Sequence, residues 1–271
     1  MTLPTHTRAV VTGAGGGLGR AFCLELARRG ASLVVSDIHE DAARATAAMI
    51  PSTKTVALRC DVSRREEVQS LARAADEAFG GTDLLINNAG VAVSGEVGAV
   101  APADWDWIVG INLMGPVYGC EAFLPDMKKR GSGHILNVAS MAGLVNAPRM
   151  GPYNVTKAGV ISLTETLYAE LKGTGVNVTV LCPSFFKTNI LDNMRGSAGD
   201  HRVIAERSMH QSPINADDVA RIALDASVKD ELYVLPHRDA RWFWRIKRVT
   251  PTGFLDRVPG ITRRLVKMMK R

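Results

Sequence analysis

Short apolar runs alternate with longer amphipathic stretches along most of this 271-residue chain. Seven runs have the length of strands and lie at residues 8–12, 33–36, 55–59, 83–86, 134–139, 177–182 and 232–235. The stretches between them have helical length and spacing, at residues 18–29, 41–49, 65–79, 103–129, 152–172 and 216–227. Strands that alternate with helices form a parallel sheet with helices on both faces. We therefore predict an α/β fold with a single doubly wound sheet of about seven strands.

Composition excludes several classes of protein. Hydrophobic residues make up 46% of the chain and charged residues 22%, which is typical of soluble globular proteins. No apolar run reaches the roughly 18 residues of a membrane-spanning helix, and residues 1–7 lack the pattern of a secretory signal. Four scattered cysteines, Cys23, Cys60, Cys120 and Cys182, lack the spacing of metal ligands. We predict buried thiols, no metal and a cytoplasmic location.

The net charge of +6 is concentrated at the C-terminal end. Residues 238–271 hold 11 of the 33 Lys and Arg but only two acidic residues, so this segment carries +9 and the rest of the chain −3. We predict a domain over residues 1–237 and a basic amphipathic extension over residues 238–271. Within the domain, the polar insertion at about residues 187–215 is the candidate substrate lid, because ligands bind beyond the carboxyl ends of the strands.

A glycine-rich turn joins the first predicted strand to the first predicted helix. Its sequence is Thr-Gly-Ala-Gly-Gly-Gly-Leu-Gly, residues 12–19. Glycines permit a tight turn and a close approach to a pyrophosphate, whose charge a helix N-terminus favours. We therefore predict a dinucleotide site that includes Gly13, Gly16, Gly17, Leu18 and Gly19.

Asp37 ends the second predicted strand, and Ile38 follows it. A carboxylate at this place can accept hydrogen bonds from both hydroxyls of the adenosine ribose and repels a 2′-phosphate. No basic residue stands at Ile38 or Gly16 to hold such a phosphate, and Arg20 lies in the first helical turn. The sequence thus favours NAD over NADP. The alternative is that Asp37 only caps the following helix.

Tyr153 and Lys157 stand four residues apart in a predicted helix, thirteen residues after Ser140. Positions i and i+4 lie on one helix face, so the phenol and the ammonium point the same way. A tyrosine has a pKa near 10, and a neighbouring cation lowers it. We therefore expect a tyrosine with a lowered pKa that exchanges protons with a substrate.

These motifs resemble those of the short-chain dehydrogenase/reductase family, in its compact branch. The resemblance runs from Arg8 to about Leu235. Its motifs stand in the family's order: Thr12-Gly13-x-x-x-Gly17-x-Gly19, Asp61-Val62, Asn87-Asn88-Ala89-Gly90, Asn112, Ser140 and Tyr153-x-x-x-Lys157. The resemblance implies a Rossmann-type fold, a nicotinamide cofactor and a homodimer or homotetramer formed through helices 103–129 and 152–172.

The family's residue roles carry over to matching positions. Tyr153 would be the general acid or base, Lys157 would lower its pKa and hold the nicotinamide ribose, and Ser140 would bind the reacting oxygen. Asn112 would support a water that leads protons from Lys157 to solvent. The remaining cofactor contacts that the resemblance implies are Asp61, Val62, Asn88, Ala89, Gly90, Pro183, Phe186 and Thr188.

One position departs from the family's pattern. Ser184 follows Pro183 where the family usually has glycine. A side chain there can alter the backbone or crowd the nicotinamide. The path of residues 183–188 is therefore open.

The segments that flank the catalytic motif predict an apolar substrate. These are residues 141–150, Phe185, Phe186, Ile190, Leu191 and Met194. They suit a steroid-like, long-chain or isoprenoid alcohol or ketone, and sugars rank second. Arg149 and Arg195 are the candidates to hold a substrate carboxylate. The leading hypothesis is an NAD-dependent alcohol dehydrogenase or ketoreductase. The rival is a non-catalytic, dinucleotide-sensing protein, against which the intact tyrosine and lysine argue.

The extension combines tryptophans with basic residues. Arg-Trp-Phe-Trp-Arg-Ile-Lys-Arg, residues 241–248, precedes a predicted short amphipathic helix at residues 261–271. We rank packing over the cleft or a neighbouring subunit slightly above a peripheral contact with a membrane surface. Nucleic acid ranks well below both, because no nucleic-acid-binding motif is present.

Overall fold

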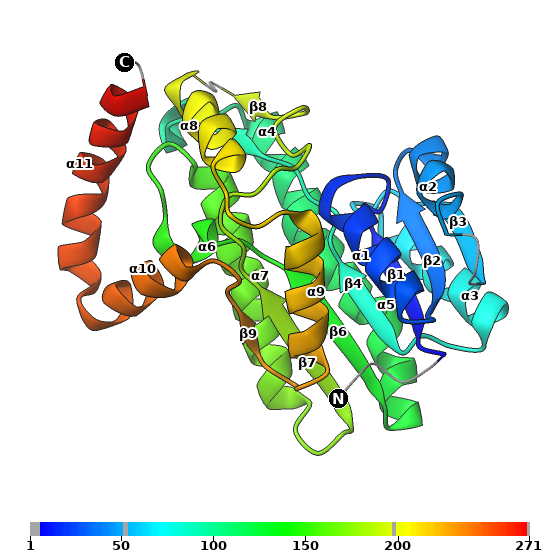
Figure 1. The fold of residues 1–271 in the computed structure, drawn as a ribbon. Helices are drawn as coiled ribbons and strands as arrows, with labels where there is room; N and C mark the ends of the chain where they lie inside the picture. The colour runs from blue at the N-terminus through cyan, green and yellow to red at the C-terminus, as the bar shows by residue number, and fades with distance from the viewer. Residues whose placement is uncertain (1–5, 51–53, 197–198, 270–271) are drawn as a thin grey trace.

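A central sheet of seven parallel strands forms the core of the protein (Figure 1). The structure is a computed structural model and describes residues 6–50, 54–196 and 199–269. The strand order is β3-β2-β1-β4-β6-β7-β9. The strands are β1 (Arg8–Thr12), β2 (Ser32–Asp37), β3 (Thr55–Arg59), β4 (Leu84–Asn87), β6 (Gly133–Val138), β7 (Val176–Leu181) and β9 (Tyr233–Val234). The predicted doubly wound α/β fold is confirmed.

Helices cover both faces of this sheet (Figure 1). One face packs against α1 (Gly17–Arg28) and α9 (Ala216–Ser227), and the other against α3 (Arg65–Phe79), α5 (Gly115–Arg130) and α7 (Gly151–Glu170). Neighbouring residues of a strand belong to the hydrophobic cores on opposite faces of the sheet. Val11 and Val35 lie in the core under α1 and α9, whereas Val10 and Val34 lie in the core under α3, α5 and α7. Strands that are buried on both faces read as continuous apolar runs, which explains the pattern in the sequence.

The helix that the sequence predicts at residues 103–129 is three consecutive segments. These are α4 (Pro102–Val109), a π-helical turn (Gly110–Met114) and α5. An 18-residue window within the stretch Pro102–Arg130 has a mean hydropathy of 1.2, so by length and composition alone this stretch could cross a membrane. It packs instead against α3, α7, β4 and β6, as the core helix of a globular domain does.

Other predicted elements differ from the structure at their ends. The last strand, predicted at 232–235, is limited to β9, and α2 (Glu40–Ala47) ends two residues before the predicted helix. Two short strands, β5 (Val93–Ser94) and β8 (Arg195–Gly196), pair with each other. A 3₁₀ turn (Val97–Ala99) follows β5, and α6 (Ala142–Val145) follows β6.

The predicted lid and extension contain three helices. The lid segment holds α8 (Gly199–His210), and the extension forms α10 (Arg238–Val249) and α11 (Pro251–Met269). The predicted helix at 261–271 is thus the second half of a longer helix. Residues 1–5 of the predicted domain, 197–198 of the lid and 270–271 of the extension lie outside the described residues. Figure 1 shows α10 and α11 beside α6 and α8, at one side of the sheet.

Candidate active site

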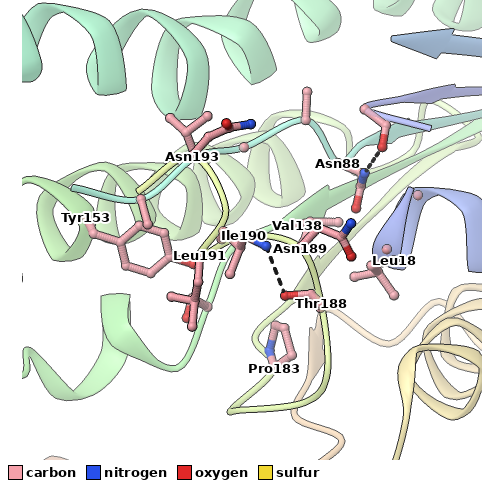
Figure 2. Close-up of a pocket in the computed structure, with 18 of the residues that line it drawn as sticks. Leu18, Asn88, Val138, Tyr153, Pro183, Thr188, Asn189, Ile190, Leu191 and Asn193 are labelled. Carbon is pink, nitrogen blue, oxygen red and sulfur yellow. Dashed lines mark hydrogen bonds between the residues drawn. The ribbon is translucent and has the colours of Figure 1, made fainter. Parts of the chain in front are cut away.

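A cleft of about 600 Å³ lies at the carboxyl ends of the strands. Strand β1 lies between β2 and β4, so the strand order runs outward from this point in both directions. In sheets of this kind, ligands bind at the carboxyl ends of the strands at such a switch point. Figure 2 shows Tyr153 and Leu191 at one end of the cleft, Leu18 and Asn88 at the other, and Thr188 between them. Every predicted cofactor residue from Gly13 to Thr188 lines this cleft.

The glycine-rich turn leaves no space for side chains at two positions. Gly13 has φ +62°, and a Cβ atom there would lie 2.7 Å from the Cα of Ala89. A Cβ atom on Gly19 would lie 2.2 Å from the carbonyl oxygen of Gly13. Gly16, by contrast, faces open space and begins α1 without a side-chain cap. The uncapped N–H groups of α1 therefore remain available to an anion in the cleft.

Asp37 fixes this turn from the end of β2. Its Oδ2 accepts a hydrogen bond from the N–H of Gly15 at 2.8 Å, and its Oδ1 accepts one from His39 at 3.0 Å. Each carboxylate oxygen keeps a second lone pair for a ligand. His39, not Asp37, is the N-cap of α2. Arg20 donates to the carbonyl of Gly15 and to Thr46, so it supports the turn from behind.

Asp61 and the segment after β4 form the next wall of the cleft. The Oδ1 of Asp61 accepts hydrogen bonds from the N–H and the hydroxyl of Ser63. The side-chain nitrogen of Asn88 donates to the carbonyls of Thr12 and Gly13 at 2.9 and 3.0 Å, which joins this segment to the glycine-rich turn. Ile38 is 45% exposed and stands between Asp37 and His39 in the sequence.

Ser140, Tyr153 and Lys157 meet at the opposite end of the cleft. Ser140 follows β6, whereas α7 carries the tyrosine and the lysine on one face. The Nζ of Lys157 donates to the carbonyl of Val138 at 2.8 Å and lies 5.9 Å from the centre of the Tyr153 ring. Gly143 lets α6 approach α7, because a Cβ there would lie 2.6 Å from the carbonyl carbon of Lys157.

Burial sets the pKa values of both titratable groups. It raises the pKa of Tyr153, which a hydrogen bond with Ser140 only partly opposes. It lowers the pKa of Lys157 to about 8. The sequence predicted that the pKa of Tyr153 is lowered. This prediction is wrong, because burial raises that pKa. Desolvation disfavours the phenolate more than the hydrogen bond with Ser140 favours it.

Asn112 lies behind the cleft and does not line it. Its side chain is fully buried in the π-helical turn and exchanges two 2.8 Å hydrogen bonds with the backbone of Val91. A Cβ atom on Gly90 would lie 3.4 Å from both Asn112 Oδ1 and Lys157 Nζ. The amide and the ammonium therefore border the same small space, and Asn112 also holds the cleft wall at Val91.

The segment after β7 is attached to the start of the C-terminal extension. The N–H of Ser184 donates to Nδ1 of His237 at 3.1 Å, and its hydroxyl donates to Asp239 at 3.3 Å. The ring of Phe186 lies beside that of His237 in a tilted contact, with ring centres 6.2 Å apart. Where the family usually has glycine, this chain thus has a serine whose hydroxyl bonds to Asp239 of α10.

The comparisons with known proteins agree with this geometry. A model of the short chain dehydrogenase family matches residues 7–198. The chain belongs to the short-chain dehydrogenase/reductase family. It is 36% identical over 190 residues to an uncharacterized oxidoreductase of Staphylococcus aureus (strain MRSA252), which covers 70% of this chain and 82% of that protein. It is 38% identical over 188 residues to the probable oxidoreductase EphD of Mycobacterium bovis, covering 68% and 32% of the two chains.

A solved structure covers more of this chain than these relatives do. The short-chain dehydrogenase/reductase from Burkholderia phymatum, in complex with NAD, is 36% identical. It covers 92% of this chain and 95% of its own, with a TM-score of 0.86. The cleft of the present chain also fits a nicotinamide cofactor. Gly13 and Gly19 have no side chain that would obstruct the glycine-rich turn, and Gly16 faces open space at the start of α1. In the part of the chain that the structure describes, no cluster of metal-ligating side chains occurs.

The remaining lining of the cleft is mostly apolar. The predicted substrate residues Met141, Val145, Met150, Phe185, Ile190, Leu191 and Met194 line it, and Gly143, Leu144, Asn146, Pro148 and Arg149 do not. Sequence analysis missed Ile204, Ala205 and Met209 of α8, because polar neighbours mask their helical spacing. Arg195 stacks on Trp107 at 3.8 Å and pairs with Asp104. Neither predicted arginine therefore stands in the cleft.

Proposed function

We propose that this short-chain dehydrogenase/reductase is an NAD-dependent oxidoreductase that acts on a hydrophobic secondary alcohol and its ketone. The observation that carries the proposal is the convergence of Ser140, Tyr153 and Lys157 on the end of the cleft that is lined mostly by apolar side chains. The described residues that line the cleft include no arginine that could pair with a substrate carboxylate or phosphate. Steroid-like, long-chain and isoprenoid alcohols fit this chemistry best.

Each residue has a role that its position supports. A nicotinamide held in this cleft would supply or accept the hydride. The phenol of Tyr153 gives its proton to the ketone oxygen in reduction and takes it back in oxidation. The hydroxyl of Ser140 donates a hydrogen bond to the same oxygen and stabilises the charge that develops there. Lys157 favours the phenolate once Tyr153 has lost its proton, and Asn112 borders the space beside it.

Asp37 is the residue that selects the cofactor. Its carboxylate lies at the adenosine end of the cleft and repels a 2′-phosphate, while Gly16 and Ile38 supply no cation for one. The remaining contacts of this proposal are Gly13, Gly17, Leu18, Gly19, Asp61, Val62, Asn88, Ala89, Gly90, Pro183, Phe186 and Thr188.

The test is cofactor reduction with a graded panel of alcohols, from short polar to steroid and long-chain. We expect turnover with NAD to exceed turnover with NADP and to rise with substrate hydrophobicity. We expect Asp37→Ala to lower the ratio of turnover with NAD to turnover with NADP by at least about tenfold. The variant loses both a contact with the adenosine ribose of NAD and the repulsion of the 2′-phosphate of NADP. A preference for NADP in the unmodified protein contradicts the assignment of Asp37. Binding of NAD with no turnover on any alcohol favours the dinucleotide sensor instead.

The family resemblance also supports a homodimer or homotetramer, and the scattered cysteines support a cytoplasmic location. The helical stretch α4–α5 and α7 are the candidate interface, where Val155 of α7 is 54% exposed. Light scattering on the purified protein distinguishes the two assemblies from a monomer. The extension is the candidate contact with a membrane surface.

A further inference from the structure

Two stripes of side chains run along the outward face of α10. Trp242, Ile246 and Val249 form an apolar stripe at i, i+4 and i+7, and these positions share one side of a helix. Trp242 is 60% exposed and Val249 is 81% exposed. Large apolar side chains with this exposure, side by side on one helix, mark a contact surface.

The second stripe is basic and lies beside the first. Arg238, Arg241, Arg245 and Arg248 are all exposed. No ion pair to these four arginines occurs among residues 6–50, 54–196 and 199–269. The one acidic residue of α10, Asp239, already accepts the hydroxyl of Ser184. The outward face therefore carries a net positive charge.

The opposite face holds α10 on the body of the protein. Ala240 is fully buried, and the ring of Trp244 packs on that of Tyr233 at 5.2 Å. The Nζ of Lys247 donates to the carbonyl of Leu144 in α6 at 2.6 Å. Phe243 packs on Phe254 of α11, with ring centres 6.1 Å apart. Folding thus uses the inward face, and the outward stripes are left to the solvent.

We propose that the outward face of α10 binds the surface of an anionic lipid bilayer. Arginines attract anionic headgroups, and tryptophan with aliphatic neighbours enters the boundary between headgroups and acyl chains. A second copy of this face does not fit, because it would bring four arginines against four. A nucleic acid would use the arginines but would leave the apolar stripe exposed to water.

The placement of α10 and α11 relates this surface to the cleft. Helix α10 packs on α6, which contributes Ala142 and Val145 to the cleft, and α11 packs on α8, which contributes Ile204 and Met209. Figure 1 shows the two helices standing at this edge of the molecule. A lipid surface against α10 would therefore lie next to the apolar end of the cleft. This last relation rests on the proposed function, whereas lipid binding itself does not.

The test is co-flotation of the full chain with vesicles. We compare vesicles of phosphatidylcholine alone with vesicles that also contain phosphatidylglycerol. The first variant is Arg238→Gln/Arg245→Gln, and its control is Arg44→Gln/Arg73→Gln, which removes two exposed arginines from α2 and α3. The second variant is Trp242→Ser/Val249→Ser, and its control is Met49→Ser, a residue that is 54% exposed and lies just after α2. Thermal unfolding verifies that each variant is folded.

We expect the unmodified protein to float with the anionic vesicles and not with the neutral ones. Each arginine near an anionic surface contributes about fivefold in affinity, so the first variant should bind about 25-fold more weakly. The second variant should bind at least tenfold more weakly at the same salt. Both controls should bind like the unmodified protein, and added salt should weaken binding.

Three results would overturn the proposal. They are failure to bind anionic vesicles at low salt, equal losses in the variants and their controls, and a change of oligomeric state in the α10 variants with vesicle binding intact. Turnover is measured separately on the same samples. An inactive protein that still binds vesicles contradicts the proposed function and leaves this inference standing.

Discussion

At the scale of single residues, the most unusual group is the buried ammonium of Lys157. Its side chain is 3% exposed, and its partner in the described structure is the carbonyl of Val138. Burial without a carboxylate partner lowers its pKa to about 8. The lysine is therefore charged at neutral pH but loses its proton within the range that an assay can reach.

The first prediction concerns ketone reduction as a function of pH. We expect kcat/KM for NADH, which reports ionisations of the free enzyme, to be constant below pH 8 and to fall above it. The reason is that Lys157 then loses the charge that stabilises the tyrosinate left by proton donation. The raised pKa of Tyr153 keeps its proton available throughout this range. A profile that stays flat to pH 10 would contradict the assignment.

Ser184 carries a second prediction at this scale. Ser184→Ala removes only the hydroxyl that donates to Asp239, whereas Ser184→Gly also frees the backbone after Pro183. We expect the alanine variant to lose about 0.5–1 kcal/mol of unfolding free energy and the glycine variant up to ~1 kcal/mol more. The KM for NAD should rise in the same order, with kcat changed less.

The measurements are chemical denaturation and initial rates on the same preparations. The control is Ser212→Ala, whose hydroxyl belongs to a turn before α9. If Ser184→Gly is as stable as the unmodified protein and has the same KM, the bond to α10 does not position this segment.

The residues of the cleft could be predicted because their chemistry is local in sequence. The glycine spacing and the Tyr-x-x-x-Lys pattern each lie within a few residues, and both are found at the cleft. The pKa of Tyr153 could not be predicted, because it depends on burial by distant segments. The partners of Ser184 are 53 and 55 residues away and have no signal in the sequence.

At the scale of elements, a buried polar chain fixes how the strands and helices meet. Asn87 of β4 donates to Asn137 of β6 at 2.8 Å, and Asn137 donates to Thr164 of α7 at 3.0 Å. The hydroxyl of Thr164 donates to the carbonyl of Val160. Gly119 of α5 packs against this chain, since a Cβ atom there would lie 2.2 Å from Asn87 Oδ1.

The third prediction follows from that contact. Gly119→Ala should lower the unfolding free energy by about 1–3 kcal/mol, because the methyl group must displace α5 or Asn87 in a packed interior. This cost exceeds the gain in helix propensity. Gly98→Ala is the control, because a methyl group at Gly98 would meet open space. Equal thermal stability of the two variants would contradict this prediction, because it would show that α5 or Asn87 moves without cost to make room for the methyl group.

Hydrophobic spacing located most elements, but it did not detect the π-helical turn. Residues 102–130 have continuous helical spacing, and Pro116, in the first turn of α5, is the local signal of the change from α4 to α5. The turn is stabilised by tertiary contacts, including the hydrogen bonds of Asn112 to Val91. Such contacts join segments 21 residues apart and leave no trace in local periodicity.

At the scale of the whole molecule, the extension is part of the cleft's surroundings. The sequence identified residues 238–271 as basic and amphipathic but did not specify which side they cover. The contact from Lys247 to Leu144 spans 103 residues. Through α6 and α8, the extension reaches both elements that border the apolar end of the cleft. The glycine-rich turn, the group of Ser140, Tyr153 and Lys157, and the extension therefore form one arrangement around the cleft.

The most direct test of this account is turnover by the Tyr153→Phe variant. The change removes the phenol oxygen and keeps the ring that packs in the cleft. We predict that NAD binding is unchanged, while alcohol oxidation falls by about 10²–10⁴-fold because proton transfer is lost. Isothermal titration with NAD and initial rates with the best alcohol of the panel measure the two effects. A phenylalanine variant that turns over at the rate of the unmodified protein would contradict the account.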